Sequence, residues 1–115
     1  MRFKITPKVK DLTNTSRREF SVNTREHPIC TDSYWDGGSR SYFRVINLET
    51  GKDFIPPMGK YPWTVKNDYT LQTGDVVIDS GHRGDGKIYV DFWCLPSDLD
   101  RILRWLRVNP TEEIK

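Results

Sequence analysis

The feature that most constrains this fold is a run of apolar residues at every second position near the C-terminus. In the segment KIYVDFWC, residues 87–94, one side of an extended chain carries Ile88, Val90, Phe92 and Cys94. A short apolar run at 76–78 precedes it, and the turn GHRGDG, residues 81–86, separates the two. Because glycine permits the backbone angles of tight turns, this region is predicted to be a β-hairpin.

Two more hairpins are predicted closer to the N-terminus. Residues 2–9 and 18–22 both alternate, and the polar cluster at 11–15 between them is typical of a turn, which indicates a hairpin with a basic outer face. Residues 29–35 and 40–48 flank the sequence Asp-Gly-Gly-Ser, which favours a second hairpin.

The last element has helical rather than strand periodicity. Apolar residues recur at the i, i+3, i+4 and i+7 positions Leu99, Ile102, Leu103 and Leu106. Ser97 is a candidate N-cap, and Asn109-Pro110 is expected to end the helix. The sequence therefore predicts a mostly β (α+β) fold, with an antiparallel sheet of about six strands in hairpins and one C-terminal helix packed on it.

Length and composition favour one globular domain. The chain has 115 residues, of which 36% are hydrophobic and 30% charged, and we expect a single domain over residues 1–110 with a tail at 111–115. No apolar run approaches the ~20 residues of a membrane span, and the first residues lack a secretory signal. Cys30 and Cys94 belong to no metal-binding motif, so we expect reduced thiols and a cytoplasmic protein.

The densest group of candidate ligand-binding residues lies at 32–44. Strand alternation predicts a row of polar and aromatic residues opposite Phe43 and Val45, beside the two glycines Gly37 and Gly38. Serine and arginine donate hydrogen bonds to anions, and tryptophan and tyrosine stack on bases. The candidates are Tyr34, Trp35, Ser39, Arg40, Tyr42 and Arg44. The alternative is a solvated hairpin stabilised by packing of tyrosine against arginine across the strands.

The glycine-rich turn after residue 80 is a second candidate. Its backbone amides, with His82, Arg83 and Lys87, could form a small anion-binding nest, although a plain hairpin loop has the same composition. A histidine between glycines lacks the surrounding groups that orient a catalytic base. We therefore expect His82 to bind rather than to catalyse.

No pattern in the sequence indicates catalysis. There is no nucleophile elbow and no phosphate-binding loop. The spacing of the carboxylates matches no calcium loop or two-metal pattern, so surface charge is the simpler interpretation of Asp32, Asp36, Asp79, Asp85 and Asp91. We expect no enzymatic activity, no cofactor and no metal.

A third region favours contact with a partner. The segment FIPPMGKYPW, residues 54–63, combines prolines that stiffen the chain with apolar and aromatic side chains. The candidate partner-binding residues are Phe54, Met58, Tyr61 and Trp63, either as a lid over the ligand site or as a docking surface. Exposed strand edges also make a homodimer a reasonable expectation.

The run DSYWDGGSRSYF, followed by a strand and an ETGK turn, resembles small uncharacterised proteins encoded by bacteriophages and related bacterial elements. The similarity covers about residues 32–52 and, more loosely, the last strand and the PSDL start of the helix. It transfers no functional residues. It implies a phage setting, in which small single-domain proteins often disarm a host system by binding.

These observations lead to three hypotheses. The first is a non-enzymatic, phage-type counter-defence protein in the host cytoplasm that sequesters a phosphorylated nucleotide-like ligand. The second is an inhibitor that docks on a host protein through the 54–63 segment. The third is a nucleic-acid-binding protein, which the small net charge of +2 makes less favourable.

Overall fold

A computed structural model describes residues 1–26, 28–30, 40–56, 68–82 and 88–115. Positions 30, 40–43, 68, 81–82 and 88 are described by their backbone alone. The expected turn at 36–39, most of the 54–63 segment and the loop at 83–87 lie outside the described residues.

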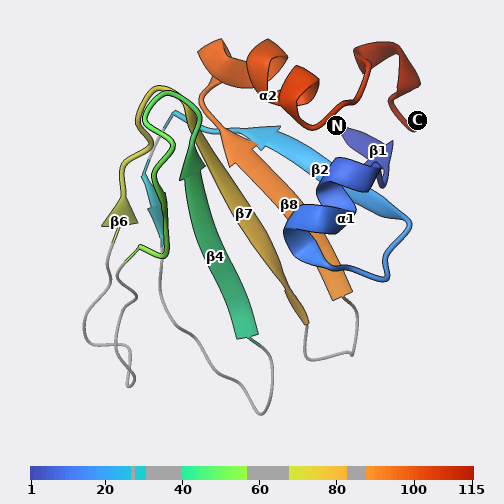
Figure 1. Ribbon diagram of the computed structural model, residues 1–115, viewed down its shortest axis with the longest axis horizontal. Helices are drawn as coiled ribbons and strands as arrows, with labels where there is room; N and C mark the ends of the chain where they lie inside the picture. The colour runs from blue at the N-terminus through green and yellow to red at the C-terminus, as the bar shows by residue number, and fades with distance from the viewer. Residues whose placement is uncertain (27, 31–39, 57–67, 83–87) are drawn as a thin grey trace.

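The main sheet has six strands in the order β1-β2-β8-β7-β4-β5 (Figure 1). Their bounds are Arg2–Lys4 for β1, Glu19–Thr24 for β2, Arg40–Asn47 for β4, Asp53–Phe54 for β5, Asp75–His82 for β7 and Ile88–Cys94 for β8. β2 and β8 are parallel, and the other neighbours are antiparallel. The mostly β, α+β class and the six-stranded sheet are confirmed, while the sheet is mixed rather than wholly antiparallel.

The hairpin predicted around the glycine-rich turn is present. β7 and β8 are antiparallel neighbours, with Ile78 opposite Phe92 and His82 opposite Ile88. Val90, Phe92 and Cys94 are all buried, as their alternation predicted. This hairpin forms the centre of the sheet.

The first predicted hairpin is only half correct. β1 and β2 do pair, with Phe3 opposite Phe20, but the segment Pro7–Thr13 between them is helix α1 rather than strand and turn. Thr6 accepts a hydrogen bond from the Val9 amide, and proline at the first helical position fits the helix. Asn14, in the left-handed conformation, ends it. These capping groups outweigh the short alternation.

The second predicted hairpin does not form between the parts of its strands that the structure describes, residues 29–30 and 40–47. The strand Ile29–Cys30, β3, pairs with β6, Asp68–Tyr69, in a separate two-stranded sheet. β4 instead pairs with β7 along its full eight residues and with β5 at two positions. β7 offers β4 eight paired positions, including the buried Val76, Val77 and Ile78, which is far more than a local turn can provide, so the distant partner prevails.

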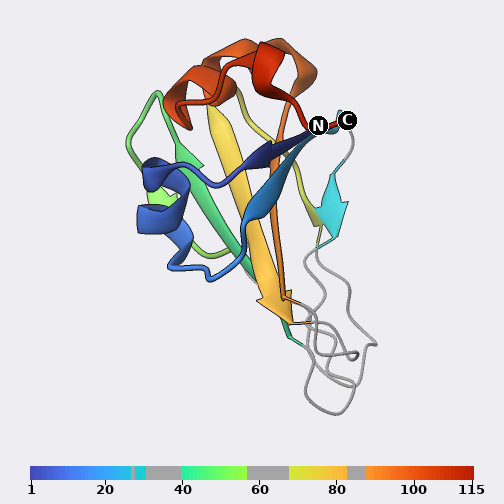
Figure 2. The ribbon, with the colours of Figure 1, turned by 90° about the vertical axis from the view of Figure 1, so that its right-hand side faces the viewer.

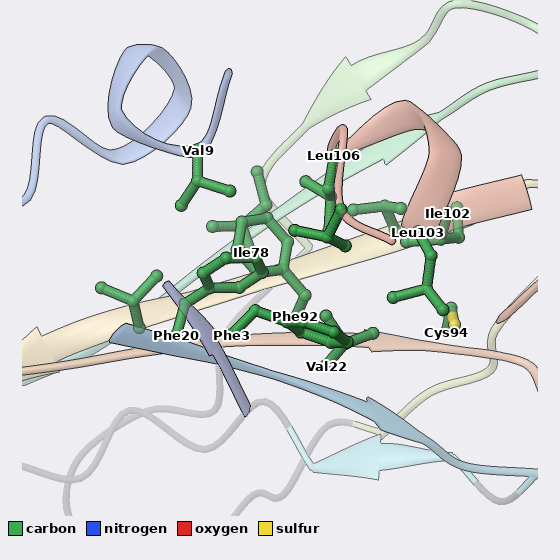
Figure 3. Packing of buried hydrophobic residues seen from close by; sticks show 13 residues of the cluster. Phe3, Val9, Phe20, Val22, Ile78, Phe92, Cys94, Ile102, Leu103 and Leu106 are labelled. Carbon is green, nitrogen blue, oxygen red and sulfur yellow. The ribbon is translucent and has the colours of Figure 1, made fainter. Parts of the chain in front are cut away.

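The larger core lies between the sheet and two helices. Helix α2, Leu99–Trp105, follows a short 3-10 helix, η1, Pro96–Asp98, and both α1 and α2 cover the same face (Figure 2). Side chains from every layer meet there, among them Phe3, Val9, Phe20, Val22, Phe92, Ile102, Leu103 and Leu106 (Figure 3). Each such fully buried side chain contributes about 1.5–3 kcal/mol. The predicted apolar stripe of the C-terminal helix is therefore confirmed.

The ends of α2 differ from the expectation. Ser97 does not cap it; Asp98 precedes the helix and makes no side-chain capping bond. The other end is a Schellman motif, in which the Val108 amide donates to the Leu103 carbonyl and the Arg107 amide to the Arg104 carbonyl. Arg107 adopts a φ of 63°, so the helix ends before Asn109 and Pro110.

A smaller core covers the opposite face of the sheet. Ile29, Val45, Leu71 and Val77 are buried there, and Phe54, Tyr69, Trp93 and Leu95 pack against them. Strand β4 is therefore covered on both faces near its C-terminal end. At the first strand, the tail returns to the sheet, because the Ile114 amide donates to the Arg2 carbonyl.

Candidate functional site

The two ends of the central strands carry the polar groups that bear on function. The first end, called the open end here, consists of Arg40 and Tyr42 at the start of β4 and Ser80 and His82 at the end of β7. Arg40 lies directly opposite His82 in the register, and Tyr42 lies opposite Ser80. The sheet thus brings together residues from two predicted candidate segments that are some forty positions apart.

Residues of the predicted polar row belong to the helix-covered face of the sheet. Arg44 shows this directly, because its Nη1 donates to the carbonyl of Leu12 in α1 at 3.4 Å. By strand alternation, positions 40 and 42 belong to the same face. At Arg44, the row predicted from the sequence therefore adjoins α1.

Arg44 itself is engaged in an ion pair. Its Nε and Nη2 donate to the two carboxylate oxygens of Asp53 at 2.8 and 2.6 Å. The hydrogen bond from Arg44 lowers the pKa of Asp53, and the positive charge of Arg44 adds to this, while burial of the carboxyl opposes it. A bidentate pair of this geometry orients the guanidinium toward β5. Arg44 is therefore more suited to shaping the site than to binding its ligand.

Two aspartates meet on the opposite face. Asp79 of β7 lies directly opposite Asp91 of β8, and both are half-buried. Side chains of directly opposed residues have Cβ atoms about 4.5–5.5 Å apart. Asp79 and Asp91 both belong to the hairpin predicted from the sequence, but their spacing alone indicates only surface charge.

Most of the other candidates lie outside the described residues. They are Tyr34, Trp35, Ser39, Met58, Tyr61, Trp63, Arg83 and Lys87. Phe54 is described and is half-buried at the edge of the smaller core, where its ring centroid lies 5.7 Å from that of Tyr69. Lys52 places its Nζ 4.8 Å above the same ring. Phe54 thus has a packing role in addition to any contact with a partner.

The second end, called the closed end here, is a hydrogen-bonded network around Asp75. One carboxylate oxygen accepts from Asn47 Nδ2 at 2.8 Å. The other accepts from the Tyr69 hydroxyl at 2.6 Å and the Gln72 amide at 2.8 Å. Asp75 is 1% exposed, so these donors replace water around its charge. Burial, followed by the hydrogen bond to Asp75, raises the pKa of Tyr69 well above its ordinary value.

A second buried carboxylate joins the closed end to helix α2. Asp98 accepts from the Gly74 amide at 2.8 Å and from Arg101 Nη2 at 2.9 Å. Gly74 has a φ of 89°, and a Cβ there would lie 2.9 Å from Glu49 Cγ, so no other residue fits this turn. Burial, with the charge of Asp98, raises the pKa of the free thiol of Cys94 to about 11. At neutral pH Cys94 is an inert, protonated core residue.

Sequence reasoning missed the closed end entirely. Asn47, Tyr69 and Asp75 carry no motif, and they converge only after β4 and β7 have paired. The signal that could have found them is the pair of polar residues, Asn47 and Asp75, each directly beside a short apolar run, 45–46 in β4 and 76–78 in β7. In the described part of the chain, no three carboxylate, histidine or cysteine side chains are grouped to hold a metal ion.

Comparison of the chain with models of known families, with curated proteins and with solved structures found no significant match. Within the described ranges, no helix has both the length and the apolar character needed to cross a membrane. A functional proposal for this protein therefore depends on the chemistry of its own residues.

Proposed function

We propose that the protein is a non-enzymatic binding protein that captures a small phosphorylated, nucleotide-like ligand at the open end of its sheet. The resemblance to phage-encoded proteins makes counter-defence in the cytoplasm of a bacterial host the biological setting of this proposal. The ligand-binding residues are Arg40, Tyr42 and His82, with Ser80 as an addition from the structure. Residues of the neighbouring segments, including Trp35, Ser39, Arg83 and Lys87, complete the predicted set.

The observation that carries the proposal is the register between β4 and β7. It sets Arg40, a permanent cation, opposite His82, and Tyr42 opposite the hydroxyl residue Ser80. A phosphorylated nucleotide needs cationic and hydroxyl donors for its phosphate and an aromatic ring for its base. These residue types occur within three positions of each other on two paired strands.

Thermal unfolding with mono-, di- and cyclic nucleotides tests the proposal. A ligand present at ~100 times its dissociation constant adds about 2.7 kcal/mol to the free energy of unfolding, which shifts the midpoint by several degrees. We expect Arg40→Ala and His82→Ala to abolish the shift. Arg104→Ala, which removes an exposed arginine of α2, is the matched control and should leave it unchanged. The absence of a shift with every nucleotide would overturn the proposal.

A second candidate function is docking on a host protein through the 54–63 segment. It is supported by Ile55, which is 53% exposed and is the large exposed hydrophobic residue of the described part of the chain. We expect a host protein to co-purify with the wild type and to be lost from both Ile55→Asp and Trp63→Ala. Retention by both variants would contradict this candidate.

A further inference from the structure

A pocket lies at the closed end of the sheet. It has a volume of about 440 Å³ and is bounded by the turn after β4, by Lys52 and Phe54, and by residues from Tyr69 to Asp75. That volume is within the range of small-molecule sites, which is about 300–1,000 Å³. We propose that this pocket binds a neutral, hydroxyl-rich ring compound, such as a monosaccharide, independently of the nucleotide-like ligand.

The floor of the pocket is built before any ligand arrives. Asn47 donates to the Thr73 carbonyl at 3.0 Å and to Asp75, while its own carbonyl oxygen accepts from the Glu49 and Thr50 amides. Because Asn47 and Asp75 are both buried and each is held by several bonds, the floor is rigid. A rigid floor reduces the entropy that binding must overcome.

The rim of the pocket presents exposed polar side chains whose hydrogen-bonding capacity is only partly used: the Thr50 hydroxyl accepts from the Lys52 amide, Gln72 Nε2 donates to the Thr70 carbonyl, and Lys52 Nζ lies above the Phe54 ring. Thr50, Lys52, Gln72 and Thr73 are all exposed and line the pocket. Together they offer an ammonium donor, an amide and two hydroxyls that both donate and accept. A sugar hydroxyl also donates and accepts, so a ring carrying several hydroxyls can satisfy each of these groups in turn.

One wall of the pocket is aromatic. Phe54 and Tyr69 are half-buried, with ring planes inclined at 67°, and both line the cavity. The Tyr69 hydroxyl is bonded to Asp75, so its ring is held in place. The apolar C–H face of a sugar ring can pack against such a wall while the hydroxyls reach the rim.

The charges around the pocket disfavour a phosphorylated ligand. Lys52 is the cation of its lining, whereas Glu49 and the buried Asp75 are acidic, and Glu49 is paired with Arg101, whose Nη1 lies 3.4 Å from its carboxylate. A multiply charged anion would meet the Asp75 carboxylate and the paired Glu49 carboxylate with a single ammonium in the lining, so repulsion disfavours it. A neutral ligand does not incur this penalty, and the open end, with Arg40 and His82, differs from the closed end in this respect.

The test is a titration of the intact protein, followed by the chemical shifts of its backbone amides. The probes are methyl glycosides of glucose, galactose and mannose at about 10 mM, with inorganic phosphate at the same concentration. We expect at least one glycoside to shift the amides of residues 49–52 and 70–74 in a saturable way, and phosphate to leave them unchanged. We expect Lys52→Met to weaken binding about tenfold, with Lys10→Met, another exposed lysine, as the matched control.

Gln72→Ala provides a second variant that keeps the floor intact, because Asp75 accepts from the backbone amide of Gln72 rather than from its side chain. It too should weaken the glycoside about tenfold. Three results would each overturn the proposal: no glycoside shifts these amides, phosphate shifts them instead, or Lys52→Met and Gln72→Ala bind as the wild type does. Nucleotide binding at the open end is tested separately with Arg40→Ala, so either proposal can fail without the other.

Discussion

The two ends of β4 and β7 differ in what their polar residues do. At the closed end, Asn47 and Asp75 are buried and bonded to Tyr69, Gln72 and the turns around them. At the open end, about 23 Å away along eight residues of strand, the register pairs Arg40 with His82. The same two strands thus carry one end whose buried groups hold the fold together beneath the proposed sugar pocket, and one end that we assign to the nucleotide-like ligand. Substitutions at the closed end should therefore cost stability first.

The largest effect is expected from Asp75→Ala. The variant leaves the Asn47 amide, the Tyr69 hydroxyl and the Gln72 amide without their acceptor, and we expect a loss of about 3–5 kcal/mol in the free energy of unfolding. Urea unfolding measures it, with Asp11→Ala on the exposed face of α1 as the control. A loss below about 1 kcal/mol would mean that the network is not what holds the closed end.

Tyr69→Phe should have the next largest effect. It removes one charge-assisted bond to Asp75, and we expect a cost of about 1–3 kcal/mol at neutral pH. The raised pKa of Tyr69 adds a pH signature. In the unfolded chain the phenol ionises near pH 10, so the contribution of Tyr69 is complete below that pH and is lost as the pH rises above it.

Unfolding at pH 8 and pH 11 separates these effects. The wild type should lose more stability between the two pH values than Tyr69→Phe does. Equal losses in the two proteins would show that neither burial nor the hydrogen bond to Asp75 raises the pKa of Tyr69.

A gain in stability is expected at the end of α2, the helix that joins the closed end through Asp98. Arg107 adopts a φ of 63°, where glycine is favoured, so Arg107→Gly should stabilise the protein by about 0.5–1 kcal/mol. Arg104→Gly, within the same helix, should destabilise it by about 1 kcal/mol. The free energy of unfolding of each variant is the measurement, and its change should have opposite signs for these two glycine substitutions three residues apart. Changes of the same sign would contradict the Schellman ending.

The smallest effect on stability is expected from the Arg44–Asp53 ion pair, which lies in β4 and β5 beside the open end. Asp53→Asn should cost less than about 0.5 kcal/mol, because Asp53 is 45% exposed and water screens its pair with Arg44. The pKa of Asp53 is lowered in the folded protein, so its contribution is present above about pH 4 and is lost as the pH falls through the lowered value. Acid unfolding curves of the variant and the wild type should therefore converge at low pH, and a larger cost at neutral pH would show that Arg44 anchors the strand edge.

Elements whose evidence is local were predicted well. The stripe from Leu99 to Leu106 buries the side chains that its period selects, and the alternation in β8 buries Val90, Phe92 and Cys94. Both patterns arise within one helix or one strand, whose periodicity shows which face is buried regardless of which apolar element packs against it. Helix α1 was missed because its seven residues are too few to show a period, although Thr6, Pro7 and Asn14 are helix-end residues.

Pairing between distant segments could not be predicted. The two glycines at 37 and 38 favoured a local hairpin, yet β3 pairs with β6, and β2 pairs in parallel with β8. A parallel pair needs a long connection and leaves no turn motif that the sequence could display. The row at 40–44 could be predicted because it lies within one strand. That Ser80 and His82 lie opposite this row follows only from the register between β4 and β7.

The sequence by itself determined the class of the fold, the C-terminal hairpin and helix, and the residue types available for an anionic ligand, because each of these depends on neighbours along the chain. Only the tertiary structure decided which strands are adjacent, that Arg40 lies opposite His82 in the register, and that Asn47, Tyr69 and Asp75 form a network beneath a pocket. These features depend on the net burial that each alternative pairing achieves across the whole chain, and no local pattern contains that sum.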